Sequence, residues 1–342
     1  MSAPEQVEQQ PPQVIAAEET QTDDDTSSVG GSSFDDSLAS LRSSIVDYRR
    51  ENGRTYHRLS DGKYLLPNDE KQEQDRLDLQ HQLWLVTWDG VLCNCPKKKG
   101  AKRVLDIGTG TGIWSIDYAE EHPEATVLGV DLSPIQPEFV PPNCTFEVDD
   151  IEKEWMWSRP FDFVFIRNMN SSFTSWEDVF KKAYDNLEPG GYLEVQDHDL
   201  PLKCDDGTMT DESWAYKWTQ LLVEGGDKMG HPNNVAPHFE QMLIDIGFED
   251  VEVRRERWPM TPWPKDEKHK RMGQWLRANI LRGLEAISLA LFTRVLDFTR
   301  EEALVWCAQV REEHKKLDVH GYYDIYAVWG RKPLKEASEA PQ

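Results

Sequence analysis

The sequence predicts an α/β protein built on a doubly wound, mainly parallel sheet with an antiparallel pair of strands at one edge. From Lys102 onward, short apolar runs alternate with helical patterns, which is typical of βαβ units. A glycine-rich loop follows the first apolar run, at the place where open α/β sheets bind ligands. Two later runs, 251–257 and 322–329, have the length of strands and would supply the antiparallel pair. Right-handed crossovers then place helices on both faces of the sheet.

The N-terminal 95 residues divide into two parts. Residues 1–41 hold nine acidic residues and no Lys or Arg, so we predict that 1–37 form a disordered acidic tail that can bind protein partners. Residues 38–95 are expected to form a helical extension over the ligand site. Apolar residues recur there at helical spacing between 38 and 48, and a strong helix is predicted from Asp69 to Trp88.

The main domain, residues 96–334, holds the alternating elements. Five strands are predicted, at 103–106, 126–130, 145–148, 161–166 and 192–195. Helices are predicted at 113–121, 176–187, 214–223, 237–246, 268–289 and 299–317. We expect 200–235 to form a lid and 265–297 a helical insertion, with 335–342 as a loose C-terminus.

Composition excludes several classes of protein. Among the 342 residues, 38% are hydrophobic and 10% aromatic, too many for a wholly disordered chain. The formal net charge of −24 argues against a nucleic-acid or membrane-surface binder. No run approaches the ~20 apolar residues of a membrane span, and no secretory signal is visible. Of five cysteines only Cys93 and Cys95 are close, so reduced thiols and no metal site are expected, with a cytoplasmic or nuclear location.

The loop after the first strand carries the chemistry. The strand ends at Asp106, and Gly108, Gly110 and Gly112 then open a helix. Alternate glycines let a ligand approach the backbone without meeting a Cβ atom. The spacing is G-x-G-x-G, and Ile113 occupies the third glycine position of the dinucleotide fingerprint. The pattern therefore disfavours a nicotinamide dehydrogenase and favours a ligand without a pyrophosphate.

Carboxylates end the next two strands. Asp131 ends the second strand, where it can accept hydrogen bonds from both hydroxyls of a ribose. Asp149 and Asp150 end the third, and either can accept from an adenine amino group, with Ile151 against the ring. The set describes a nucleoside that lies across three strand ends.

These motifs resemble a known family. VLDIGTGTGIW, GVDLSPIQP, FEVDD, FDFVFIRNM and LEPGGYLEVQD resemble the successive motifs of class I S-adenosyl-L-methionine-dependent methyltransferases. ENGRTYH, YLLPNDEKQEQDRLDLQH, RWPMTPWP and GRKP further resemble the fungal LaeA-like methyltransferases, which are named for a regulator of secondary metabolism. The resemblance covers nearly all of the chain except its two ends.

The resemblance implies a fold, a cofactor and a site. The fold is a Rossmann-like, seven-stranded sheet whose last strand is antiparallel, and the cofactor is S-adenosyl-L-methionine. Asp106, Gly108, Gly110 and Gly112 would hold its methionine portion. Asp131 would hold the ribose, and Asp149 or Asp150 the adenine.

Catalytic candidates follow the fourth and fifth strands. His198, flanked by Asp197 and Asp199, is the best candidate for a general base, and Arg167 could grip an acidic acceptor. A surface position for His198 and an ordinary ion pair for Arg167 remain the alternatives. His57 and His81 lie in segments expected to cover the cofactor, where a structural role is the simpler interpretation.

The leading hypothesis is a methyltransferase (EC 2.1.1.-) that acts on a small-molecule intermediate of fungal secondary metabolism. One alternative is a nuclear regulator of secondary-metabolite gene expression with a protein acceptor, to which the basic run at 96–103 would add a localisation signal. The other is a cofactor-binding scaffold without turnover. The sequence does not identify the acceptor.

Overall fold

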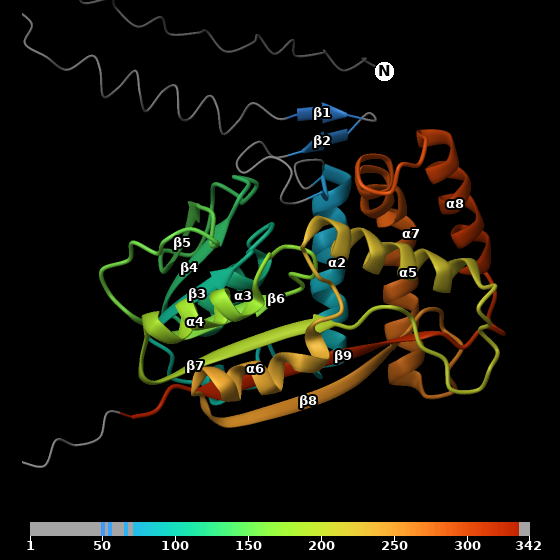
Figure 1. The fold of residues 1–342 in the computed structure, drawn as a ribbon. Coiled ribbons are helices and arrows are strands. Elements are labelled where there is room, and N and C mark those ends of the chain that lie inside the picture. The colour runs from blue at the N-terminus through green and yellow to red at the C-terminus, as the bar shows by residue number, and fades with distance from the viewer. Residues whose placement is uncertain (1–48, 52–53, 57–64, 68–70, 335–342) are drawn as a thin grey trace, which may run out of the picture. The chain divides into compact units, whose positions relative to one another are not determined.

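The computed structural model describes residues 49–51, 54–56, 65–67 and 71–334, and all of them belong to one unit, 42–342 (Figure 1). The predicted acidic tail 1–37, the helical spacing at 38–48, His57 and the loose C-terminus 335–342 lie outside the described residues. Within the extension, a short hairpin of β1 (Arg49–Glu51) and β2 (Arg54–Tyr56) precedes α2 (Lys71–Thr87).

The seven-stranded sheet is confirmed. Its order is β5 (Cys144–Val148), β4 (Thr126–Asp131), β3 (Arg103–Ile107), β6 (Phe161–Arg167), β7 (Leu187–His198), β9 (Tyr322–Arg331) and β8 (Glu249–Pro259). The first five strands are parallel, and β9 is antiparallel to both of its neighbours. The antiparallel strand is therefore one place in from the edge. The edge strand β8 runs in the direction of the parallel strands because it pairs antiparallel with β9.

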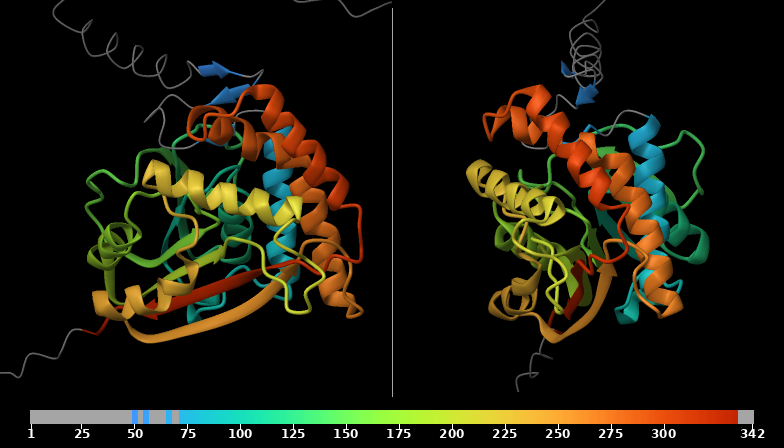
Figure 2. Two further views of the ribbon diagram at one scale, coloured as in Figure 1. Left: turned by 45° about the vertical axis from the view of Figure 1, so that its right-hand side comes forward. Right: turned by 90° about the vertical axis from the view of Figure 1, so that its right-hand side faces the viewer.

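Alternation along the strands creates two apolar faces. Val104 and Phe163 pack in one hydrophobic cluster, while their chain neighbours Leu105 and Val164 pack in the other. Helices α4 (Trp176–Asn186) and α6 (Phe239–Ile246) cover the second face. The first face is covered by α2, α3 (Ile113–Glu121), α5 (Trp214–Met229), α7 (Glu267–Arg294) and α8 (Arg300–Glu313). Figure 2 shows α7 and α2 running side by side on this face.

Local chemistry fixes the ends of the added helices. Asp266 caps α7 by accepting from the backbone N–H of His269 at 2.9 Å. Thr299 and Glu302 form a capping box at the start of α8. The two caps fix where α7 and α8 begin.

Strand β7 begins earlier than predicted. The sequence places its start at 192, after a Pro-Gly-Gly turn, but β7 starts at Leu187 and passes through that turn. Gly190 has a φ of +80°, and a Cβ on Gly191 would lie 2.9 Å from the carbonyl oxygen of Glu188. The two glycines thus lie where β7 shifts register against β6, between the pairs Phe161–Leu187 and Phe163–Tyr192, and the ladder with β9 begins at Tyr192.

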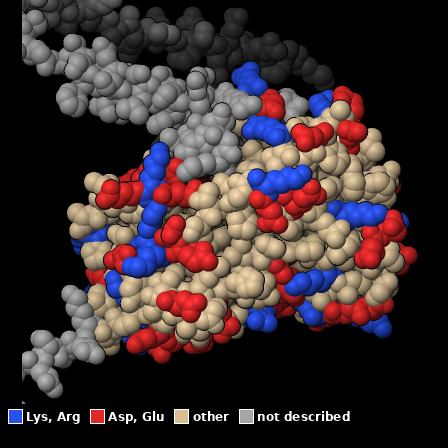
Figure 3. All heavy atoms as spheres, viewed as in Figure 1, with Lys and Arg blue, Asp and Glu red and all other residues tan. Residues whose placement is uncertain are grey.

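The surface mixes charges of both signs. Figure 3 shows Lys and Arg side chains interspersed with Asp and Glu over the described part of the visible face. In the basic run, Pro96–Lys98 form a short 3₁₀ turn, and Lys97 pairs with Asp162 at the start of β6 at 3.0 Å. Among the described residues, no helix has the length and apolarity needed to cross a bilayer.

Candidate functional site

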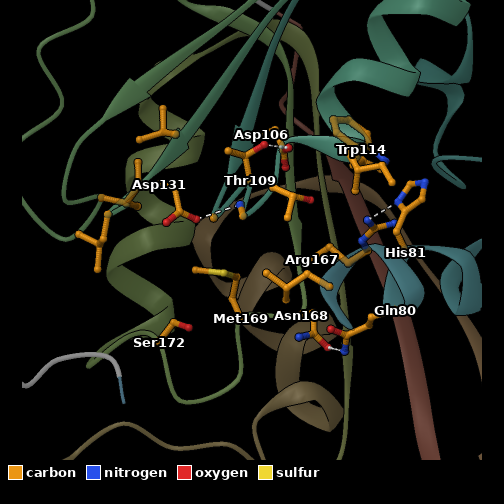
Figure 4. A pocket seen from close by; sticks show the side chains of 18 of the residues that line it. Gln80, His81, Asp106, Thr109, Trp114, Asp131, Arg167, Asn168, Met169 and Ser172 are labelled. Atoms are coloured by element: carbon orange, nitrogen blue, oxygen red, sulfur yellow. Dashed lines mark hydrogen bonds between the residues drawn. The ribbon is translucent and has the colours of Figure 1, made fainter. Parts of the chain in front are cut away.

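A cavity opens at the carboxyl ends of the parallel strands. Its walls come from the loops after β3, β4, β5 and β6 and from one face of α2 (Figure 4). All the predicted cofactor residues except Gly112 line this cavity. Other lining residues had no role predicted from the sequence: Leu77, Gln80, Trp84, Thr109, Thr111, Leu132, Met169 and Phe173. The strand-end position is where an open α/β sheet binds ligands.

The glycine loop has backbone angles that favour glycine. Gly108, Gly110 and Gly112 have φ values of +69°, +58° and +79°. A Cβ on Gly108 would lie 2.1 Å from Sδ of Met169, so the loop after β6 presses directly on the backbone here. Gln136 then fixes the loop, because its Nε2 donates to the carbonyl oxygen of Gly110 at 2.7 Å.

Asp106, in β3, fixes the glycine loop through two hydrogen bonds. Its Oδ2 accepts hydrogen bonds from Oγ1 of Thr109 at 2.6 Å and from Oγ of Ser115 at 2.7 Å. The side chain is buried, and this burial raises the pKa of Asp106 although both hydroxyls oppose the rise. Oδ1 is the oxygen that remains for a ligand.

Asp131 is fixed by backbone donors. Oδ2 accepts from the N–H of Gly110 at 2.9 Å and Oδ1 from the N–H of Ser133 at 3.0 Å. Burial nevertheless raises the pKa of Asp131 to about 6. The carboxylate is thus rigidly aimed, with lone pairs left for donors inside the cavity.

The two candidates for adenine binding differ in burial. Asp150 is buried, and its Oδ1 accepts from the N–H of Glu152 at 3.1 Å. Asp149 is exposed, and its Oδ1 accepts from the N–H of Asp150 at 2.7 Å. Ile151 is buried and lines the same wall. Asp149 therefore shapes the turn that presents Asp150 and Ile151.

A chain of three polar side chains crosses the cavity wall. Nη2 of Arg167 donates to Nδ1 of His81 at 2.8 Å, and Nε2 of His81 lies 2.9 Å from Oδ2 of Asp117 (Figure 4). Because Nδ1 accepts, His81 is neutral with its proton on Nε2, which agrees with the lowered pKa that burial gives this histidine.

Arg167 itself has no carboxylate partner within salt-bridge distance among the described residues. Its guanidinium lies 5.9 Å from the ring centre of Trp84 and 5.8 Å from that of Phe165. Burial lowers the pKa of Arg167 to about 10, so it stays charged at neutral pH. Arg167 therefore lines the first cavity, whereas the sequence suggested that it binds an acidic acceptor.

A second cavity adjoins the first. Gln80 and Asn168 line both, and Nε2 of Gln80 donates to Oδ1 of Asn168 at 2.8 Å across the shared wall. Asn168 and Ser171 have φ values of +59° and +61°, which are unusual for residues other than glycine. His198 lines this second cavity and lies at the end of β7.

The carboxylates beside His198 are engaged elsewhere. Asp197 accepts from the N–H of Met169 at 2.7 Å and from the N–H of His198 at 2.9 Å. Nδ1 of His198 lies 3.1 Å from Asp197 but without hydrogen-bond geometry. Asp199 pairs with Lys203 at 2.7 Å. The ring of His198 is therefore positioned more by aromatic contacts than by an acid: it stacks near Trp258 and meets Tyr323 edge to face.

The two close cysteines meet a carboxylate. Cys93, Cys95 and Glu194 are buried and offer ligand atoms within 4.8 Å of one another. Glu194, however, accepts from the N–H groups of Asn94 and Cys95 and from Nε2 of Gln196. These bonds occupy the oxygens of Glu194 and fix the segment after α2. We therefore interpret the cluster as structural. The expectation of no metal site stays a prediction.

Three polar residues of the site were missed from the sequence. Gln80, Gln136 and Asn168 lie within the quoted family motifs, but no role was predicted for them. Their roles depend on contacts between segments 26 to 88 residues apart, which no local pattern reveals.

Comparison with known proteins gives concordant results. Residues 72–253 match the family described as methyltransferase domain. The chain is 39% identical to methyltransferase pytC of Aspergillus terreus, over 87% of this chain and 92% of that protein.

Two further relatives carry the name laeA, one as a regulator and one as a protein methyltransferase. The secondary metabolism regulator laeA of Aspergillus fumigatus is 36% identical, with 83% of this chain and 77% of that protein covered. The protein-methionine methyltransferase laeA of Emericella nidulans is 32% identical, over 86% of this chain and 79% of that protein.

Proposed function

This chain belongs to the fungal LaeA-like methyltransferases, and from that premise we propose that it transfers the methyl group of S-adenosyl-L-methionine to a small molecule of secondary metabolism. The observation that carries the proposal is the pairing of a carboxylate-rich cavity at the strand ends with an apolar second cavity behind it. The first suits a cationic nucleoside and the second an organic acceptor.

The charge of the first cavity supports this cofactor. Five acidic residues line it against one guanidinium, that of Arg167, among the described residues: Asp106, Asp131, Asp149, Asp150 and Glu152. An excess of carboxylates favours a positively charged sulfonium ligand and disfavours a pyrophosphate. The glycine loop adds close backbone approach, since Gly108 and Gly110 carry no Cβ.

Each part of the cofactor has a matching group. The ribose hydroxyls would donate to Asp131, whose carboxylate the loop holds in place. The adenine would lie against Ile151 and donate to Asp150, the more buried of the two candidate acids. The amino group would meet Asp106, and the carboxylate would pair with Arg167, the cation that otherwise lacks an anion.

The residues of the chain then govern the transfer. The cofactor supplies a methyl group on a sulfonium, which is an excellent leaving group, so the protein has to align and desolvate the acceptor. Asp197 fixes the loop at Met169 that forms the cavity wall, and Gln80 bridges to Asn168 where the cavities meet. His198 is the proposed proton acceptor on the far side.

Calorimetry with S-adenosyl-L-methionine and with NAD tests the cofactor. We expect S-adenosyl-L-methionine to bind and NAD not to bind. Asp131→Ala should lower the affinity at least tenfold, because it removes the ionised acceptor for two hydroxyls. Glu138→Ala, at an exposed position in the loop beyond Asp131, is the matched control and should change nothing. Binding of NAD alone would contradict the proposal.

Metabolite profiling of a deletion strain tests the acceptor class. Loss of one methyl group from one compound supports a small-molecule acceptor. Collapse of many pathways supports the regulatory alternative, which the names of the laeA relatives keep open. An Asp106→Ala strain with an undiminished phenotype would instead support a scaffold without turnover. A fluorescent fusion of the full chain distinguishes the cytoplasmic from the nuclear location.

A further inference from the structure

The second cavity is walled by segments that lie far apart in the sequence. They come from α2, α5, α7, the loop after β6 and the ends of β7, β8 and β9. The cavity holds about 1040 Å³ of space between atoms, including the solvent at its mouth.

Two indoles give this cavity flat carbon walls. Nε1 of Trp258 donates to Oγ1 of Thr87 at 2.7 Å, and Nε1 of Trp218 donates to Oγ of Ser288 at 2.9 Å. Because both N–H groups are used within the protein, the rings are held rigidly and present apolar surface. Aliphatic side chains complete the walls: Leu200, Leu222, Leu276, Ile280, Ile287 and Leu291. Such walls bind aromatic surface well.

The cavity offers no unpaired charge to an ionised ligand. Arg76 is its one guanidinium among the described lining residues, and Glu73 neutralises it at 2.6 Å. Nη1 of Arg76 also donates to Oδ1 of Asn279 at 2.7 Å, which ties α2 to α7. No Asp, Glu or Lys lines the described wall. An ionised ligand would therefore lose hydration without gaining a partner.

Two amide oxygens and one imidazole nitrogen, Nδ1 of His198, are buried in the lining without a partner among the described residues, and the two oxygens can only accept. Oδ1 of Asn170 and Oδ1 of Asn233 are buried without a partner. Their amide groups are oriented, because Nδ2 of Asn170 donates to the carbonyl oxygen of His198 and Nδ2 of Asn233 to that of Leu222. Both residues line the cavity, as does the ring of His198. A ligand that satisfies them must bring N–H or O–H donors.

We infer that the second cavity takes an uncharged aromatic acceptor bearing O–H or N–H groups, methylated at the atom that lies against the Gln80–Asn168 bridge. The inference rests on the proposed function, because it assigns the acceptor of that reaction. The acceptor oxygen or nitrogen forms a bond to the methyl carbon, and the carbon–sulfur bond breaks with its electron pair passing to sulfur. The acceptor's proton goes to the ring of His198.

Three naphthalene probes separate the chemical classes. 2-Naphthol is uncharged with one O–H donor, naphthalene has no donor, and 2-naphthoate is an anion. Tryptophan fluorescence and calorimetry, with S-adenosyl-L-methionine present, should show 2-naphthol binding at least tenfold more tightly than the other two. Equal or tighter binding of 2-naphthoate overturns the inference. Failure of all three probes with normal cofactor binding also overturns it but leaves the proposed function intact; failure of the cofactor to bind defeats both.

Two variants locate the probe. Ile280→Trp fills the cavity and should reduce 2-naphthol affinity at least tenfold while the affinity for S-adenosyl-L-methionine is unchanged. Leu281→Trp, the next residue of α7 and outside the lining, is its control. If Ile280→Trp fails to fold, Tyr323→Phe removes only a hydroxyl from the lining and should lower 2-naphthol affinity about threefold. Tyr326→Phe, which lies in the cluster on the opposite face of the sheet, should not. Unchanged 2-naphthol affinity in Tyr323→Phe and in any folded Ile280→Trp overturns the inference.

Discussion

The two cavities are built in different ways. In the first, polar side chains are fixed by the ends of parallel strands and by hydrogen bonds to nearby backbone, as Asp131 is by Gly110 and Ser133. In the second, three helices and the added segments supply mainly apolar walls. Strand-end chemistry is local and follows a motif, whereas a helical wall depends on packing between segments distant in sequence. The first cavity can therefore hold one ligand throughout a family while the second varies.

The largest effect on cofactor binding, with no effect on the second cavity, is expected when the cation of the first cavity is removed. Arg167→Met should weaken S-adenosyl-L-methionine binding roughly 10–150-fold, since a hydrogen bond to a charged group contributes about 1.5–3 kcal/mol. The decarboxylated cofactor, which has no carboxylate for Arg167, should bind wild type and variant equally. Calorimetry with both ligands checks this. If the variant still prefers the carboxylated ligand by the wild-type factor, Arg167 does not hold that group.

Acidity should weaken cofactor binding in the first cavity. Burial raises the pKa of Asp131 to about 6, so below that pH the carboxyl is protonated in the free protein and accepts poorly from the ribose. Affinity for S-adenosyl-L-methionine should then fall about tenfold for each pH unit below 6 and be flat between 7 and 8. Binding of 2-naphthol, which stays uncharged over this range, serves as the comparison. An affinity that is constant from pH 7 to pH 5 would remove Asp131 from the ribose site.

A methyl group added between the helices should act on the second cavity alone. In Gly283→Ala the new Cβ would lie 2.6 Å from Cδ of Arg76, whose guanidinium is locked by Glu73 and Asn279. Overpacking of this kind costs about 1–3 kcal/mol, partly offset by the helix propensity of alanine. We expect a Tm a few degrees lower and weaker 2-naphthol binding with normal cofactor affinity. The cost should shrink in an Arg76→Ala background, and a cost that stays the same would place the strain elsewhere.

The smallest effect is expected at the wall that both cavities share. Gln80→Met keeps the length of the side chain but removes the hydrogen bond to Asn168, worth about 1 kcal/mol. Methyl-transfer turnover should fall about fivefold, with cofactor affinity nearly unchanged. Gln82→Met, on the exposed side of α2, is the matched control. Equal loss of turnover in both variants would mean that the substitutions act by destabilising α2 and not by removing the Gln80–Asn168 hydrogen bond.

The residues of the first cavity could be predicted from the sequence because they follow local patterns at the ends of consecutive strands. A strand, three alternate glycines and an acid at each following strand end can be recognised without knowing any distance. The segment 200–235, which the sequence predicts as a lid, supplies Trp218 and Asn233 to the lining of the second cavity, and its role as a lid stays a prediction.

Contacts between distant helices could not be predicted from the sequence. The approach of Arg76 to Gly283 and the hydrogen bond of Arg167 to His81 join residues 86 or more positions apart. Nor does periodicity distinguish an edge strand from the one beside it, which is why the inner position of β9 was not foreseen.

Helix α2 serves both cavities through neighbouring positions. Leu77 and His81 face the cofactor side, Arg76 faces the other, and Gln80 reaches both. Each residue of a helix turns the chain by 100° and advances it by about 1.5 Å. Deleting one residue inside α2 would therefore rotate the following side chains by about 100°, so that residues of one cavity would point towards the other. Both cavities would be disrupted. Substitutions can tune either cavity separately, whereas we expect changes in length to be tolerated only in the connections at either end of α2.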